Sequence, residues 1–275
     1  TSARTLIGLL AVEAPHLIRH LIRHKEGLDE IKAYCQCAAE VSDEVEIDAS
    51  RLSAVHAMML ALRAGKAERA RAQFERMFWE SGLDVPDVAW RTHGIEYKTL
   101  SCERFDRPFD SDTRISVILT AHNEEEMLPV AVQSLLAQSW RNLELVIVDD
   151  ASTDGTWGVA DAFAARDPRV KVVKLPANVG LWAAKNVGFQ HCTGSIVTMH
   201  DADDWSHWRK LELQAVPLLR NPGLAATSSY MLRVDQQTGA PYTRNARNYL
   251  RWNPSSFMFP ASTLAEAGGF LDKML

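Results

Sequence analysis

The residues of this chain that could do chemistry follow three short, largely apolar runs. The runs are residues 115–121, 143–148 and 195–199, and the polar groups that end or follow them are Thr120, Asn123 and Glu124, then Asp149 and Asp150, then Asp201, Asp203 and Asp204. If the runs are parallel strands, their carboxyl ends share one edge of a sheet, where ligands of such sheets bind. Carboxylates gathered there repel one another. A divalent cation relieves that repulsion, and hard oxygen ligands favour Mg²⁺ or Mn²⁺.

Strand and helix patterns alternate from residue 114 onward. The predicted strands are residues 115–121, 143–150, 170–175, 195–204, 225–232 and 255–260, and the predicted helices are residues 124–139, 154–167, 180–192, 207–219 and 261–267. Such alternation predicts an α/β fold, with a mainly parallel sheet and helices on both faces.

The preceding residues have a different character. Apolar residues recur at three- and four-residue spacing between residues 52 and 81, with a turn at 64–66, so residues 1–99 are predicted to form an α-helical domain. One helical pair resembles a tetratricopeptide-like hairpin, and it suggests a site for a protein partner. Residues 100–113 are polar and are predicted to be a linker, with a second domain at residues 114–275.

Composition excludes several classes of protein. The 275 residues are 47% hydrophobic and carry a net charge of −5, which fits a soluble globular chain and argues against a basic nucleic-acid binder. The Cys content of 4 predicts no disulfide framework and a reducing, cytoplasmic setting; attachment to the inner face of the membrane is the alternative. No apolar stretch reaches the ~18 residues of a transmembrane segment. The chain begins at Thr1, and we expect it to be a fragment of a longer protein.

Familiar phosphate-binding loops are missing from the sequence. No G-x-G-x-x-G follows the first predicted strand, and no G-x-x-x-x-G-K-[ST] occurs anywhere. The glycine-rich loop expected of a sugar nucleotidyltransferase is also missing, because A-H-N-E-E stands in its place. What remains is a metal–diphosphate site without a loop that cradles phosphate.

Four segments together resemble the inverting family 2 glycosyltransferases, which have the GT-A fold. The segments are ISVILTAHNEE, LELVIVDDASTDGT, NVGLWAAKNVGF and TMHDADDW, in the order and at about the spacings usual in the family. The segment SSFMFPASTLAEAGGF is similar to the one that precedes the family's catalytic base. The resemblance implies a Rossmann-like nucleotide-diphospho-sugar transferase domain at residues 114–275, which we expect to be truncated at its C-terminus.

The resemblance also implies a role for each matching residue. A nucleotide pocket would be lined by Thr120, Ala121, Asn123 and Glu124; Asp150 would bind the base or ribose; Lys185 would lie near the diphosphate; and Asp204 would shape the acceptor side. Asp201 and Asp203 would be the catalytic and metal-binding D-x-D pair, with Asp203 the better candidate for direct metal contact. The general base is expected beyond Leu275, so this chain is expected to bind donor but to be weak or inactive as a transferase.

The implied reaction moves a sugar from a nucleotide-diphosphate donor, UDP by resemblance, to a glycan or other hydroxyl acceptor, with inversion and with Mn²⁺ or Mg²⁺. Synthesis of surface polysaccharide is the expected setting. A transferase-like binding protein without catalysis is the alternative, and nucleotidyl transfer is a second enzyme class. The missing glycine-rich loop counts against nucleotidyl transfer.

Several other residues have a structural interpretation. Packing or neighbouring roles are predicted for His122, His200, Gly188, Trp205 and Trp208, and a surface helix position is an alternative for Lys185. His16, His20 and His24 share a helix face, but interleaved basic residues favour a solvated face or partner contact over a metal site. Cys35 and Cys37 are predicted to be buried helix cysteines.

Overall fold

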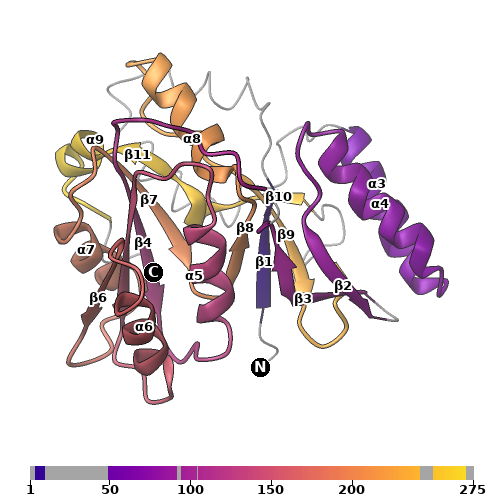
Figure 1. The fold of residues 1–275 in the computed structure, drawn as a ribbon, viewed down its shortest axis with the longest axis horizontal. Coiled ribbons are helices and arrows are strands. Elements are labelled where there is room, and N and C mark those ends of the chain that lie inside the picture. Colours follow the sequence, from indigo (N-terminus) through magenta and orange to yellow (C-terminus); the bar gives the residue numbers. More distant parts are fainter. Residues whose placement is uncertain (1–3, 10–48, 92–93, 104, 242–249, 271–275) are drawn as a thin grey trace.

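The computed structural model describes residues 4–9, 49–91, 94–103, 105–241 and 250–270 (Figure 1). The predictions for His16, His20, His24, Cys35 and Cys37 lie outside these residues. The elements, in chain order, are β1 (Arg4–Leu9), α3 (Ala49–Arg63), α4 (Ala67–Trp79), β2 (Asp87–Arg91), β3 (Gly94–Ser101), β4 (Ile115–Ala121), α5 (Leu128–Leu136), β5 (Leu143–Asp149), α6 (Thr156–Ala164), β6 (Val170–Lys174), α7 (Leu181–Gln190), β7 (Ile196–Asp201), β8 (Asp204–Ser206), α8 (Lys210–Arg220), β9 (Tyr230–Asp235), β10 (Leu250–Trp252), the 3₁₀ helix η2 (Pro254–Ser256), β11 (Met258–Pro260) and α9 (Ala261–Glu266).

A five-stranded sheet forms the centre of the C-terminal part. Its strand order is β11-β7-β4-β5-β6, with β4 parallel to both β5 and β7, and with β11 antiparallel to β7. Every residue of β4 and β5 is buried, as expected for strands covered on both faces. The prediction of a mainly parallel α/β sheet is therefore confirmed.

Helices cover both faces of this sheet. Helices α5, α6 and α8 share a core with one face of β4 and β5, whereas α7 and α9 pack on the opposite face. Helix α7 approaches closely because it carries Gly188, where an added Cβ atom would lie 2.5 Å from the Cγ2 atom of Ile118. Gly188 is thus a packing residue, as its sequence context predicted.

The buried carboxylate of Glu144 connects the amino ends of β4, β5 and β6. Glu144 on β5 accepts hydrogen bonds from Ser116 Oγ at 2.6 Å and from Lys171 Nζ at 2.6 Å. Burial raises the pKa of Glu144, but these bonds and those from Thr193 outweigh it and hold the pKa at about 2. The network binds β4, β5 and β6 together at the end of the sheet opposite the strand ends that carry the acidic residues.

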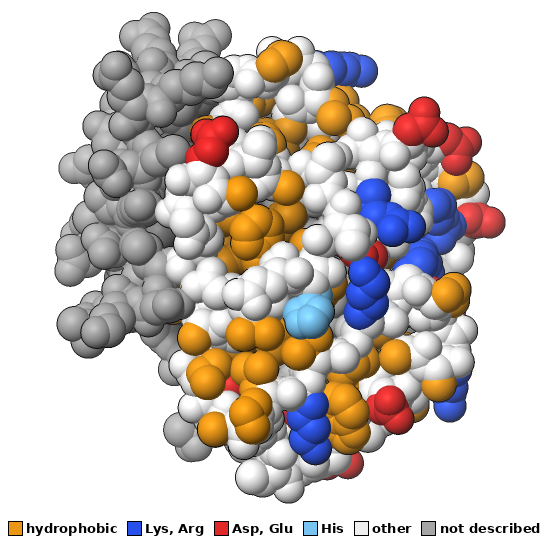
Figure 2. All heavy atoms as spheres, turned by 90° about the vertical axis from the view of Figure 1, so that its left-hand side faces the viewer, with side chains coloured by type: hydrophobic (Ala, Val, Ile, Leu, Met, Phe, Trp, Pro, Cys, Tyr) orange, Lys and Arg blue, Asp and Glu red, His pale blue; other side chains and the backbone are white. Residues whose placement is uncertain are grey.

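Strand β6 is the edge of the five-stranded sheet, and its exposed positions carry Lys171 and Lys174. Charged residues on an edge strand discourage pairing with another chain. Figure 2, which looks at the left-hand side of Figure 1, shows Lys and Arg side chains among apolar ones on this side of the molecule.

The N-terminal part differs from the prediction of a purely helical domain. Helices α3 and α4 are present, but residues 4–9 and 87–101 form strands. Strand β1 lies between β8 and β9 in a second sheet of order β10-β9-β1-β8, parallel to β8 and antiparallel to β9. Its partners come from residues 204–206 and 230–235, so no local pattern could have indicated the pairing.

The antiparallel hairpin of β2 and β3 was also predicted wrongly as helix. Strand β2 alternates exposed and half-buried positions, and β3 carries the β-branched and aromatic residues Ile95, Tyr97 and Thr99 at every second position. That two-residue period is typical of a half-buried strand, and it outweighs the weaker helical pattern.

Helices α3 and α4 and the hairpin share a single core with residues that follow the acidic turn. Trp205, Trp208 and Leu232 belong to this core together with Phe74 and Phe78 of α4. Trp205 and Trp208 are each 2% exposed, so their predicted packing role is confirmed. The N-terminal elements therefore support the strand that follows the acidic turn.

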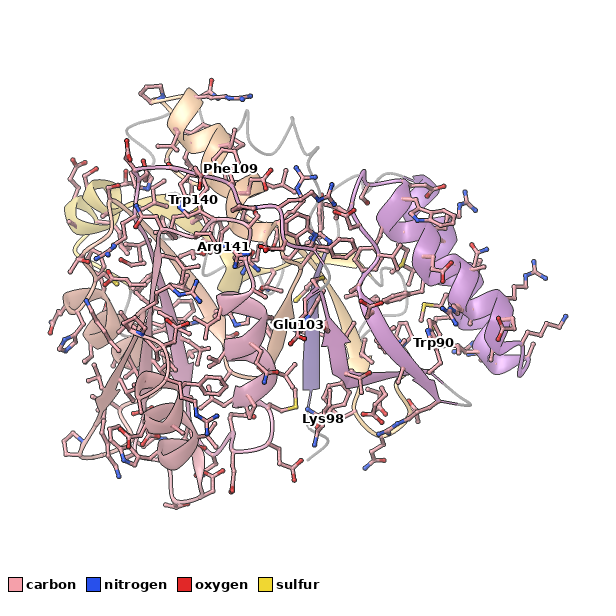
Figure 3. The ribbon with its side chains drawn as sticks, in the orientation of Figure 1. Trp90, Lys98, Glu103, Phe109, Trp140 and Arg141 are labelled. Atoms are coloured by element: carbon pink, nitrogen blue, oxygen red, sulfur yellow. The ribbon has the colours of Figure 1, made fainter. Side chains whose placement is uncertain are left out.

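The segment predicted to be a linker is anchored at several points. The ring of Phe109 stacks on the ring of Trp140 with centroids 5.0 Å apart, and Asp106 forms an ion pair with Arg141 at 2.5 Å (Figure 3). The division into two domains with this linker remains a prediction. Among the described helices, none combines the length and hydropathy needed to cross a bilayer.

Candidate active site

The carboxyl ends of the central strands meet at one edge of the sheet. Ala121 at the end of β4 pairs with Asp149 at the end of β5, and Thr120 pairs with Asp201 at the end of β7. The loops that follow carry the predicted polar residues, so the sequence prediction of one shared edge is confirmed. We call this edge, with Glu124, Asp201 and Asp203, the acidic rim.

Two residues of the rim loops have backbone angles that are rare for non-glycine residues. Asn123 has φ 58° and Ala151 has φ 56°. For alanine the left-handed conformation costs roughly 1–2 kcal/mol. Asn123 is held by hydrogen bonds: its amide donates to Ser152 Oγ at 3.0 Å, and its Oδ1 accepts from the amide of Thr153 at 2.8 Å. The two loops are therefore fixed against each other, and such strain is typical of functional sites.

Lys185 lies beneath the rim rather than on the surface. Its side chain is 0% exposed, and its Nζ atom lies 2.9 Å from Asp201 Oδ1. Nζ also lies 4.9 Å from the ring centroid of Trp182, a cation–π contact. The alternative of a surface helix lysine is therefore wrong. In this structure the ammonium group of Lys185 contacts the carboxylate of Asp201.

Asp201 is an ionised carboxylate. Burial raises its pKa, but the charge of Lys185 and a hydrogen bond from Ser255 lower it further than burial raises it, so the net shift is downward. Asp201 therefore contributes a fixed negative charge to the rim.

The other rim carboxylates respond to that charge. Burial raises the pKa of Asp203 to about 7, with further contributions from the charges of Asp201 and Glu124. Burial, then Asp154 and Asp201, also raises the pKa of Glu124. Mutual repulsion of this kind is what a divalent cation relieves, so the donor set fits Mg²⁺ or Mn²⁺. Among the described residues, no group of three or more His, Cys, Asp or Glu side chains is placed to hold a metal ion.

Asp204 lies behind the rim and not on its surface. It is 3% exposed, and burial followed by the charges of Asp203 and Asp201 raises its pKa well above its usual value. Its Oδ1 atom is buried without a hydrogen-bond partner among the described residues. Lys210 on α8 is buried nearby, and burial lowers its pKa to about 8.

Both histidines at the site form hydrogen bonds with backbone carbonyl groups. His200 Nδ1 lies 2.8 Å from the carbonyl of Asp201, and Nε2 lies 2.8 Å from Ser206 Oγ. A carbonyl only accepts, so Nδ1 carries the proton and Nε2 accepts from the serine. Burial lowers the pKa of His200 to about 3. By the same reasoning His122 Nδ1 donates to the carbonyl of Asp150 at 2.7 Å.

The other residues predicted to line the nucleotide pocket, Asp150, Ala121 and Thr120, are buried. Asp150 is 4% exposed and accepts from the amides of Val179 at 2.8 Å and Gly180 at 2.9 Å, so it fixes the start of α7. The methyl group of Ala121 packs in the core. Thr120 is 6% exposed, and its Oγ1 atom has no hydrogen-bond partner among the described residues.

Three residues around the rim were missed by sequence reasoning. Ser255 bonds to Asp201, Asn253 bonds to Asp204, and Lys210 places a buried cation behind both carboxylates. The signal for Lys210 was a lysine on the buried side of an amphipathic helix. The signal for Asn253 and Ser255 was a polar cluster just before a buried strand.

A family model matches the part of the chain that contains the central strands and the acidic rim. The model of the family described as Glycosyl transferase family 2 matches residues 116–265. The putative glycosyltransferase EpsE of Bacillus subtilis is 36% identical over 128 residues, which are 46% of this chain and 46% of that protein. The putative teichuronic acid biosynthesis glycosyltransferase TuaG of the same organism is 33% identical over 127 residues, which are 46% of this chain and 50% of that protein. The matches therefore span half or less of these relatives.

Solved structures give a partial likeness. The mannosyltransferase PcManGT from Pyrobaculum calidifontis, solved with GDP-Man and Mn²⁺, is 21% identical, with a TM-score of 0.48 over 81% of this chain and 60% of that one. S. aureus TarS 1-349, solved with UDP-GlcNAc, is 20% identical, with a TM-score of 0.44 over 57% of this chain and 48% of that one.

Proposed function

Because the chain belongs to glycosyl transferase family 2, we propose that it transfers a sugar from a nucleotide-diphosphate donor to a hydroxyl group of a glycan or another acceptor. The observation that carries the proposal is the acidic rim, where Asp201, Asp203 and Glu124 meet at the carboxyl ends of parallel strands. The name of TuaG supports surface polysaccharide synthesis as the setting. UDP as the nucleotide and the cytoplasm as the location are part of the same proposal.

A divalent cation, Mn²⁺ or Mg²⁺, would be held by Asp203 and Asp201. Asp203 is only half buried, and Oδ1 of Asp201 is already occupied by Lys185. When bound, such a cation stabilises the negative charge that grows on a leaving diphosphate.

The chain's own residues would hold the donor and the rim in place. Lys185 keeps Asp201 ionised and oriented, and Asp150 fixes the start of α7 beside the donor. We propose that Thr120, Asn123 and Glu124 line the nucleotide pocket. Inversion needs a base on the opposite face of the sugar to take the acceptor proton, and we assign that role to none of the described residues.

Nucleotide binding should raise the unfolding temperature of the chain only when a divalent cation is present. We would measure unfolding with UDP, GDP, ADP and CMP, each in Mn²⁺, Mg²⁺ and EDTA. A ligand at about 100 times its Kd adds roughly 2.7 kcal/mol to the unfolding free energy, a shift of a few degrees. A shift with one nucleotide that EDTA removes supports the proposal. No shift with any nucleotide contradicts it.

A further inference from the structure

A second concave site lies between α4 and β2. Its volume is about 320 Å³, and its wall includes Arg71, Phe74, Glu75, Trp79, Asp87 and Trp90. We call it the tryptophan pocket. Figure 1 shows α4 at the right-hand side of the molecule beyond the hairpin, with the five-stranded sheet on the left. The pocket is therefore built from elements other than those that form the acidic rim.

The two tryptophans of the pocket differ in how they are held. Trp90 is half buried, and its ring meets the ring of Phe74 edge to face, with centroids 5.6 Å apart and an interplanar angle of 86° (Figure 3). Trp79, the last residue of α4, is 67% exposed. Core packing explains the position of Trp90. It does not explain why so large an apolar ring as Trp79 is left in water beside a pocket.

Charged side chains share the wall with these rings. Arg71 Nε donates to Glu75 Oε1 at 3.0 Å across one turn of α4, and Asp87 stands at the start of β2. A purely apolar occupant would strip water from these charges without replacing its hydrogen bonds, which is costly. The wall therefore favours an occupant with both an apolar face and many hydroxyl groups.

We infer that the tryptophan pocket binds a pyranose unit of a glycan. The C–H face of a pyranose ring packs on an indole, and its equatorial hydroxyls suit carboxylate and guanidinium partners, the mix of apolar walls and few polar groups typical of ligand pockets. The inference rests on the proposed function in one respect, namely that a transferase of this family handles glycans. The pocket then holds an acceptor or product chain away from the donor site.

The hairpin provides a physical link between pocket and rim. Strand β2 carries Trp90 into the pocket, and its partner β3 carries Lys98, whose Nζ atom lies 2.8 Å from Glu126 Oε2. Glu126 belongs to the loop that follows β4. The same loop carries Glu124. A glycan bound at the pocket would therefore lie on an element that touches the loop beside the rim.

Saturation-transfer NMR tests the inference with defined probes. The probes are the methyl glycosides of glucose, galactose, mannose, rhamnose, N-acetylglucosamine and N-acetylgalactosamine, together with cellotetraose and chitotetraose. Trp79→Ala should fold normally because the ring is mostly exposed. We expect transfer to at least one probe with the unaltered chain, about tenfold weaker binding with Trp79→Ala, and an intermediate loss with Trp79→Phe.

A matched control removes an exposed apolar side chain elsewhere. Leu219 on α8 is 47% exposed, and Leu219→Ala should bind the probes as the unaltered chain does. The inference is overturned if no probe binds, if Trp79→Ala binds as well as the unaltered chain, or if Trp79→Ala changes only the oligomeric state. Nucleotide binding in Mn²⁺, measured on the same samples, should be equal in all variants. If no sample binds nucleotide but the unaltered chain still binds a probe, the proposed function is contradicted and the inference of a sugar-binding pocket is retained.

Discussion

Asp203→Asn should abolish metal-dependent nucleotide binding and leave the fold intact. Asp203 is the half-buried carboxylate of the rim, and the charges of Asp201 and Glu124 act on it directly. An amide of the same shape keeps the packing but loses the charge that a cation needs. We expect at least a hundredfold weaker UDP binding in Mn²⁺ by calorimetry. The unfolding temperature without ligand should be equal or slightly higher, since a repelled charge is removed.

The pH dependence of binding follows from the same carboxylate. Burial and its acidic neighbours raise the pKa of Asp203 to about 7, so below that pH a proton occupies the group and competes with the cation. Metal-dependent binding should weaken by up to about tenfold for each pH unit below 7. A flat profile between pH 5 and 8 would exclude Asp203 as the metal ligand.

Glu126→Gln is the matched control for Asp203→Asn. Glu126 lies in the same loop region but pairs with Lys98 at an exposed position. Its substitution should leave nucleotide binding unchanged. Equal binding by Asp203→Asn and the unaltered chain would place the metal elsewhere.

Lys185→Met should cause the largest loss of stability among single substitutions at the site. The lysine is 0% exposed and its Nζ atom lies 2.9 Å from Asp201 Oδ1. Removing one partner of a buried ion pair leaves an uncompensated charge and costs about 3–5 kcal/mol. The unfolding temperature should fall by roughly 10 °C, since 1 kcal/mol corresponds to about 2–4 °C for a chain of this size. Thermal unfolding followed by circular dichroism measures the change.

The double variant Lys185→Met with Asp201→Asn separates the two roles of the lysine. It removes both charges, so it should recover part of the lost stability. If Lys185→Met unfolds at the original temperature but binds nucleotide weakly, the lysine contacts the diphosphate rather than supporting Asp201. That result would overturn the buried-pair account.

Strong local patterns explain why the central sheet could be predicted from the sequence. Strands β4 and β5 are rich in Val, Ile and Leu, typical of parallel strands buried on both faces, and acids stand at or just after their ends. Parallel strands place those ends at one edge whatever the details of packing. The acidic rim could therefore be predicted before any contact was known.

Two of the features that sequence reasoning missed depend on contacts distant in sequence. Strand β1 pairs with residues about 200 positions away, and no local pattern encodes that choice. The burial of Lys185 on α7 depends on Asp201 at the end of β7. A helical lysine preceded by apolar residues is compatible with either a surface or a core position, and only tertiary packing decides between them.

A crystal structure of the chain grown with UDP and Mn²⁺ tests the acidic rim most directly. The account predicts a cation bound to Asp203 and to oxygens of the diphosphate, with the nucleotide lying along the carboxyl ends of β4, β5 and β7 and with Lys185 still paired to Asp201. Anomalous scattering identifies the Mn²⁺ ion. A nucleotide bound away from this edge, or a cation at the diphosphate without Asp203 among its ligands, would contradict the account.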